Sequence, residues 1–183
     1  MTTTDPTLGL HSLATMARVL GRSQPLTDVL EVAAEGARLT LGAASVSISR
    51  YDTEDASLHT LINVGDLAPS EVRWPESETY PVTRWPELAE VLRYGATRVD
   101  RRDDEQGDPR ERDLLTRLGK GSSVTASVIV DDRVWGEFYA TRHLGHASFT
   151  EQSVDYVEVL VALLGGAISR SVREADLVRQ VSR

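Results

Sequence analysis

Side chains able to ligate a metal are few in this 183-residue chain, which has no cysteine and four histidines. His143 and His146 are close enough in sequence to face one ion, but two imidazoles without a third ligand make a poor site. His59 alternates with Leu58 and Thr60 on an expected strand. This position favours a surface histidine, and a role of His59 as a haem ligand is the open alternative. We therefore expect no metal site and no resident cofactor.

Motifs for nucleophilic or phosphate chemistry are also missing. The sequence has no Gly-x-Ser-x-Gly or Ser-x-x-Lys arrangement that would activate a serine. The stretch 119–121 reads Gly-Lys-Gly but lacks the flanking pattern of a phosphate-binding loop, so we interpret it as a turn. The acidic run 103–105 lies in a stretch of mixed charge and is interpreted as a solvated loop. We expect no enzyme; Glu137 and Asp100 are the acids that an enzyme would use.

The composition is that of an ordinary soluble domain, with 40% hydrophobic and 26% charged residues and a formal net charge of −8. It predicts one core-forming domain. The acidic balance argues against a nucleic-acid partner. The longest apolar run, Val159 to Ile168, is half of the roughly 20 residues that a membrane-spanning helix needs. With no cysteine, a reducing cytoplasmic location fits best.

Two helices are expected before any strand. Apolar residues recur every three or four positions from Leu10 to Leu20, and again from Leu26 to Leu41, which is the periodicity of an amphipathic helix. Gly21 and Gly42 follow these stretches and are typical of helix ends.

Two hairpins follow from period-two alternation. The segment 44–51 is expected to pair with 57–64, and 123–130 with 134–142 across a tight connection at 131–133. The residues between the hairpins predict short strands at 78–82 and 97–100, together with two proline-initiated helices that start at Pro86 and Pro109. This insertion is therefore structured and is not an empty loop.

A long helix is expected after Thr150, a suitable N-cap. Its first half is apolar enough to pack on a sheet, whereas beyond Ile168 only a narrow apolar stripe continues, as in a coiled coil. We expect residues 1–22 to form an N-terminal dimerisation helix, 23–168 the domain itself and 169–183 a coiled-coil linker. The expected dimerisation residues are Leu13, Leu20, Ile168, Val172, Ala175 and Val178.

The order of these elements, together with a set of short strings, resembles a GAF domain of the actinobacterial signalling-protein type. The strings are Tyr80-Pro81-Val82, Trp85-Pro86, Arg98-Val99-Asp100, Glu111 to Leu115, Ser122-Ser123-Val124, Val134 to Phe138 and Phe149-Thr150. The resemblance covers about residues 25–168. It implies an α+β fold: a six-stranded antiparallel sheet with the N- and C-terminal helices on one face and a small-molecule pocket on the other, capped by the insertion. It also implies a dimer built on the terminal helices.

Known functional classes of GAF domains use particular residues, and their presence or absence can be checked in this sequence. Bilin-binding members and free methionine sulfoxide reductases of this fold use cysteines, which this chain lacks. Cyclic-nucleotide-binding members share an Asn-Lys, Phe, Asp-Glu signature, and this sequence has one lysine and no such spacing. Haem-binding members ligate iron through a histidine. Because this chain has four histidines, haem binding stays an open alternative.

The most informative prediction concerns the residues on the face of the sheet opposite the helices. If Val46, Phe138 and Val134 face the helices, alternation places small hydroxyl side chains on the other face. Such a face either meets solvent, or is covered and filled with water, or forms the floor of a ligand cavity closed by the insertion. Arg84 is expected to meet an anion there. The expected ligand-binding residues are Ser47, Ser49, Tyr80, Arg84, Trp85, Asp100, Thr125, Ser127, Glu137 and Tyr139.

These observations predict a sensory module that binds a small polar ligand of unknown identity. The change on binding would pass through a dimeric C-terminal helix to an output domain such as a diguanylate cyclase or kinase. The alternative is a ligand-free dimerisation or protein-interaction scaffold.

Overall fold

The computed structural model describes residues 6–182, and side chains from residue 9 onward; the first five residues of the expected N-terminal segment lie outside this range. Its elements are α1 (Pro6–Leu20), α2 (Leu26–Leu41), β1 (Ser45–Asp52), β2 (Ser57–Gly65), β3 (Thr79–Pro81), the 3₁₀ turn η1 (Val82–Arg84), α3 (Pro86–Tyr94), β4 (Thr97–Arg101), α4 (Pro109–Leu118), β5 (Lys120–Val130), β6 (Arg133–His143) and α5 (Glu151–Val181).

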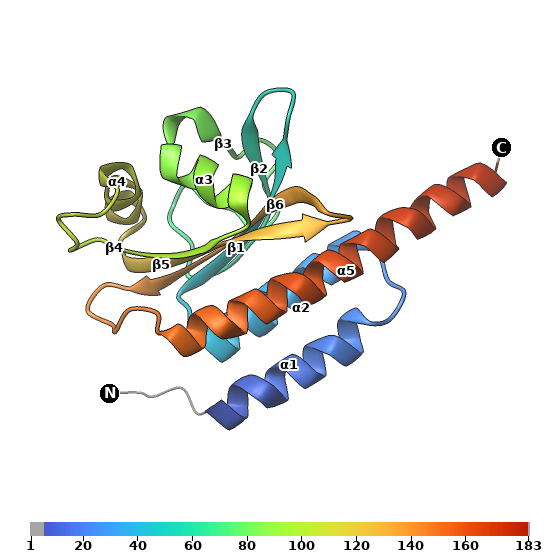
Figure 1. Cartoon of the computed structure of the whole chain (residues 1–183), viewed down its shortest axis with the longest axis horizontal. Coiled ribbons are helices and arrows are strands. Elements are labelled where there is room, and N and C mark those ends of the chain that lie inside the picture. The colour runs from blue at the N-terminus through green and yellow to red at the C-terminus, as the bar shows by residue number, and fades with distance from the viewer. Residues whose placement is uncertain (1–5, 183) are drawn as a thin grey trace.

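The six strands form one antiparallel sheet in the order β3-β2-β1-β6-β5-β4. Helices α2 and α5 pack on one face of the sheet, and α1 lies outside them, in contact with both. Helices α3 and α4 lie on the opposite face (Figure 1). The fold is therefore the expected α+β arrangement, with the insertion placed over the second face of the sheet.

Local sequence signals start and end the helices. The side chain of Asp108 accepts a hydrogen bond from the backbone N–H of Arg110 at the start of α4, and Thr150 forms a capping box with Ser153 at the start of α5. Gly42 adopts a left-handed conformation after α2, which lets the chain turn directly into β1.

The main core lies between the sheet and the two inner helices. Val46, Ile48 and Phe138 from the strands are fully buried against Val157 and Leu164 of α5. Helix and strand approach so closely that a Cβ on Gly165 would lie 2.1 Å from the carbonyl oxygen of Ile129. The apolar burial on this face is the main stabilising contribution to the fold.

Helix α5 has the length and composition of a membrane span, but half of its most apolar stretch is buried inside the domain. Leu160, Leu164 and Ile168 are among its fully buried residues. The apolar composition of α5 is therefore explained by its contact with the sheet and α2. The helix continues past residue 168 without a break.

One expectation about side-chain orientation in the sheet is wrong. Val134 was expected on the helix-covered face, but a register shift between Val128 and Ile129 pairs Ile129 with Val134. This bulge adds one residue to β6 and reverses the side chains beyond it. Val134 therefore packs against the cluster of Leu58, Val82 and Leu92 on the insertion side, whereas Trp135 packs against the main core.

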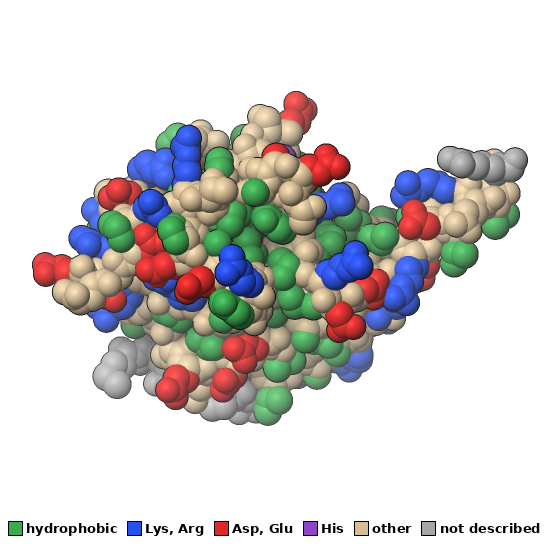
Figure 2. Space-filling view, turned by 45° about the horizontal axis from the view of Figure 1, so that its top comes forward, with side chains coloured by type: hydrophobic (Ala, Val, Ile, Leu, Met, Phe, Trp, Pro, Cys, Tyr) green, Lys and Arg blue, Asp and Glu red, His purple; other side chains and the backbone are tan. Residues whose placement is uncertain are grey.

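The structure also changes the expected dimer contacts. Leu20 and Ile168 are 1% and 0% exposed within the single chain, so they belong to its own core and cannot form a dimer interface. Val172 and Val178 of α5 are exposed, and the C-terminal end of this helix projects beyond the sheet (Figures 1 and 2). Of the other expected contacts, Ala175 is also exposed and Leu13 is half-buried, so these residues remain accessible to a second copy.

Candidate functional site

The floor of the candidate site is built by strand register. Ser47 of β1 and Thr125 of β5 pair with Tyr139 of β6 on either side, and in the next row Ser49 and Ser127 pair with Glu137. Because strand side chains alternate between faces, these rows point away from the main core, as the sequence predicts.

The insertion forms the roof. A small cluster of Leu58, Val82 and Leu92 anchors α3 to the sheet, and Leu115 of α4 is fully buried. Between floor and roof lies a cavity of about 60 Å³. Its lining residues are Ser47, Ser49, Leu58, Thr60, Glu71, Glu78, Tyr80, Trp85, Leu88, Val91, Arg98, Asp100, Asp108, Glu111, Leu114, Leu118, Thr125, Glu137 and Tyr139.

Eight of the ten residues expected to bind a ligand line this cavity: Ser47, Ser49, Tyr80, Trp85, Asp100, Thr125, Glu137 and Tyr139. Of the other two, Ser127 lies on the same face but beneath α3, where its hydroxyl donates to the carbonyl oxygen of Val91 at 2.8 Å. Arg84 is exposed on the outer side of the insertion, in a groove with Arg110 and Arg117. The expectation that Arg84 meets an anion above the sheet is therefore wrong, because η1 turns its side chain away.

Glu78 links the roof to the floor through hydrogen bonds. Its carboxylate accepts from the Thr60 hydroxyl at 3.0 Å, from the Asn63 amide at 2.8 Å and from the Tyr80 hydroxyl at 3.1 Å. Burial and the neighbouring negative charge of Glu78 raise the pKa of Tyr80, so that its hydroxyl stays a donor.

Glu111 reaches the floor from α4. One of its carboxylate oxygens accepts from the Ser123 hydroxyl at 2.8 Å and from the Tyr139 hydroxyl at 2.6 Å. Burial raises the pKa of Glu111, although these two hydrogen bonds act in the opposite direction. Burial likewise raises the pKa of Tyr139.

The remaining roof acids also have partners. Asp100 accepts from two guanidinium nitrogens of Arg98, at 2.8 and 2.6 Å, and the same guanidinium contacts Glu87. Burial raises the pKa of Asp100 against the influence of Arg98. Asp108 caps α4, and Glu71 accepts from the backbone N–H of Ala68 at 2.7 Å.

Glu137 differs from every other acid in the cavity wall. It is 8% exposed, and its carboxylate accepts no hydrogen bond and pairs with no cation within residues 9–182. Burial, and then the charge of Glu111, raise its pKa to about 8. A buried carboxyl group without a partner in the protein is costly in its ionised form, which is why its pKa is raised.

Trp85 contributes a second unsatisfied group. Its ring meets that of Tyr80 edge-on, with 6.3 Å between the centroids. The indole N–H is buried and finds no acceptor in the described part of the chain.

Four acids of the cavity wall were not among the expected ligand-binding residues. Glu71, Glu78, Asp108 and Glu111 all line the cavity. The sequence holds a usable signal for Glu111 alone, because three- and four-residue spacings place it on the same helix face as Leu114, Leu115 and Leu118.

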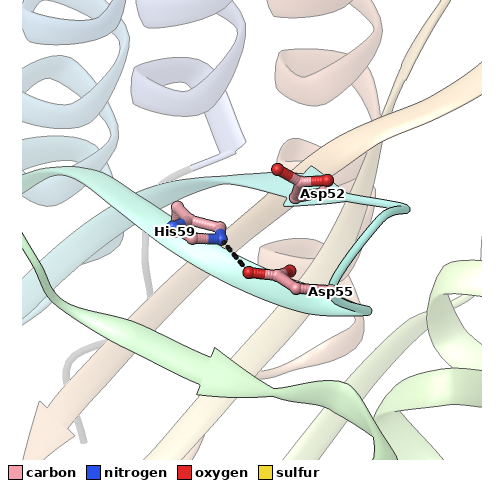
Figure 3. A group of neighbouring side chains, drawn as sticks. All are labelled: Asp52, Asp55 and His59. Atoms are coloured by element: carbon pink, nitrogen blue, oxygen red, sulfur yellow. Dashed lines mark hydrogen bonds and ion pairs between the residues drawn. The ribbon is translucent and has the colours of Figure 1, made fainter.

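A separate acidic group lies at the end of the β1–β2 hairpin. Asp52, Asp55 and His59 have ligand atoms within 4.8 Å of one another, and the His59 ring nitrogen lies 3.0 Å from the Asp55 carboxylate (Figure 3). Asp55 is exposed and the other two are half-buried. This arrangement explains His59 as a residue hydrogen-bonded to Asp55 near the surface, and no described histidine lines the cavity.

His143 and His146 lie at the opposite end of β6. Their rings are 5.5 Å apart, and His143 lies 3.6 Å from the carboxylate of Asp66. His146 is exposed and His143 is only half-buried. The pair is therefore a solvated surface group, as the sequence indicates.

The fold and cavity define a class of protein: a single α+β domain with a cavity between one face of its sheet and the insertion. The family model described as GAF domain matches residues 25–168. The chain belongs to the GAF family.

Solved structures support the same fold. The chain is similar to the phycocyanobilin-bound GAF domain of a cyanobacterial phytochrome, with a TM-score of 0.74, 20% identity and coverage of 91% of this chain and 96% of that one. It is also similar to the GAF domain of an Acinetobacter phosphoenolpyruvate-protein phosphotransferase, with a TM-score of 0.69, 15% identity and coverage of 90% and 94%. A search of curated proteins found no match.

Proposed function

We propose that this GAF domain is a sensory module that binds a small polar ligand between its sheet and its insertion. The observation that carries the proposal is the cavity itself, whose wall contains the unpartnered carboxyl group of Glu137 and the unpartnered N–H of Trp85. Buried polar groups are normally satisfied, and a bound molecule supplies what this wall lacks.

The proposed ligand is much smaller than the chromophore of the similar phytochrome domain. The cavity is about 60 Å³, below the roughly 300–1,000 Å³ of pockets for drug-sized ligands. The chain also has no cysteine for covalent attachment.

A route from the cavity to α5 supports signal relay. Strands β5 and β6 carry Thr125 and Glu137 of the cavity floor and meet at a hairpin whose Asp131 accepts from Ser169 at 2.9 Å and from Arg173 at 2.7 Å, both on α5. A ligand-dependent shift of this hairpin would therefore move α5.

The projecting end of α5 supports dimerisation and output. Val172, Leu177, Val178 and Val181 are 42%, 61%, 66% and 88% exposed on a helix that extends beyond the body (Figures 1 and 2). We propose that two copies pair along this segment and pass the change to a partner domain such as a diguanylate cyclase or kinase, and that the domain itself is not catalytic and acts in the cytoplasm.

Native mass spectrometry and thermal-shift measurements of the purified chain test the sensory function. We expect a small molecule to be retained, or a metabolite panel to contain a compound that raises the melting temperature. If no compound binds and the chain is dimeric, the alternative function as a ligand-free dimerisation scaffold is favoured. The exposed apolar residues of α5 also support this alternative.

A further inference from the structure

The charges that line the cavity are strongly one-sided. The described lining residues include one basic side chain, Arg98, and six acidic side chains: Glu71, Glu78, Asp100, Asp108, Glu111 and Glu137. Arg98 is already held between Asp100 and Glu87. An anionic ligand would therefore meet a negative wall without a free cation to bind it.

The hydrogen bonds show which acid is available. Glu78 and Glu111 accept from hydroxyl and amide donors, Asp108 caps a helix, and Glu71 accepts from a backbone N–H. Glu137, more than nine-tenths buried, faces the cavity with both carboxylate oxygens unpartnered by residues 9–182. A ligand with several hydrogen-bond donors would therefore bind next to Glu137 of β6, at the floor of the cavity.

We propose that the cavity recognises a small organic cation, an ammonium or guanidinium compound whose N–H groups donate to Glu137. This assignment rests on the sensory function proposed above and specifies its ligand class. Glu111, joined to the neighbouring Tyr139, adds a second negative charge on the same side of the cavity.

The rest of the wall fits the carbon part of such a molecule. Leu58, Leu88, Leu114 and Leu118 present apolar surface, and Tyr80 and Trp85 add aromatic rings. A metal ion would instead require several oxygen ligands converging on one point, and most of the carboxylates here are already engaged in separate hydrogen bonds. Aromatic rings also attract organic cations. The volume of about 60 Å³ restricts the bound group to a few non-hydrogen atoms.

Matched probes test the charge requirement. Guanidinium and propylammonium are compared with their neutral counterparts urea and 1-propanol, with the anion propionate, and with Mg²⁺, by calorimetric titration and melting temperature at millimolar concentration. We expect the two organic cations to bind at least about tenfold more tightly than urea and propanol.

Variants locate the binding. Glu137→Gln keeps the shape of the side chain but cannot ionise. In titrations at about pH 9, above the folded pKa of Glu137, it should weaken cation binding by about tenfold or more. Glu90→Gln makes the same change on the exposed side of α3, outside the cavity, and should leave the affinity unchanged. Circular dichroism verifies that both variants are folded.

The outcomes separate the two proposals. Equal binding of urea or propanol, preference for propionate or Mg²⁺, or equal loss in both variants overturns the organic-cation assignment but leaves a ligand-binding module. If none of the probes binds, and no metabolite binds in the broader screen either, the sensory function itself is overturned.

Discussion

Replacing Glu137 with glutamine should stabilise the folded chain, and the gain should grow with pH. Glu137 is 8% exposed and has no described partner, and its burial raises its pKa from the ordinary 4.5 to about 8. Between these two values the unfolded chain has released a proton that the folded chain retains. The contribution of this residue to stability is therefore fully present below pH 4.5 and is lost as the pH rises to the folded pKa.

The interval between the two pKa values sets the magnitude. At about 1.36 kcal/mol for each pKa unit, the full loss corresponds to about 5 kcal/mol near pH 8. Glutamine removes the charge but keeps a buried amide without a partner, which offsets part of the gain. We therefore expect Glu137→Gln to raise the free energy of unfolding by about 2–3 kcal/mol near pH 8 and by much less near pH 5.

Denaturant unfolding of the unsubstituted chain and of Glu137→Gln, at about pH 5 and about pH 8, measures the difference in their free energies of unfolding. The same gain should appear as a rise of about 4–12 °C in melting temperature at the higher pH. Glu90→Gln, on the exposed side of α3, is the control and should show no pH-dependent gap. A gap for Glu137→Gln that stays constant between the two pH values, or a loss of stability at the higher one, would refute the placement of an unpaired, buried carboxyl group at this position.

Three further tests address the scaffold. Gly165→Ala should destabilise the chain by about 1–3 kcal/mol, because its Cβ would meet the carbonyl oxygen of Ile129 at 2.1 Å, whereas Gly166→Ala, on the open side of α5, should stabilise it by up to about 1 kcal/mol in the same denaturation assay. Val178→Asp, at a side chain that is 66% exposed, should weaken self-association in sedimentation without changing the unfolding of the monomer, and an unchanged dimer would exclude this interface. Asp132→Gly should raise the melting temperature slightly, because Asp132 has a φ of 61° in the β5–β6 turn that glycine adopts without strain.

The hydroxyl-lined face of the sheet could be predicted because it depends on local alternation. Once Val46 and Phe138 are assigned to the main core, strand geometry places Ser47, Thr125 and Tyr139 on the other side, and register makes Ser47 and Thr125 neighbours of Tyr139. The helix ends at Gly42 and Thr150 were predictable for the same reason, since capping uses residues within one turn of the helix.

The acidic character of the cavity could not be predicted in the same way. Glu71 and Glu78 lie in the irregular segment between β2 and β3, where no periodicity indicates which side chains turn inward. The outward position of Arg84 depends on η1, a single 3₁₀ turn. The bulge that reverses Val134 arises from pairing between two strands and leaves no mark in the hydrophobic pattern of either one.

The sequence alone determined the helix and strand order, the two faces of the sheet and the absence of cysteine chemistry, because these follow from residue type and short-range spacing. Only the tertiary structure decided that Leu20 and Ile168 belong to the core of one chain, and that six acids converge on a cavity in which Glu137 has no described partner. Burial and charge balance depend on which distant segments meet, and that is a property of the packed chain.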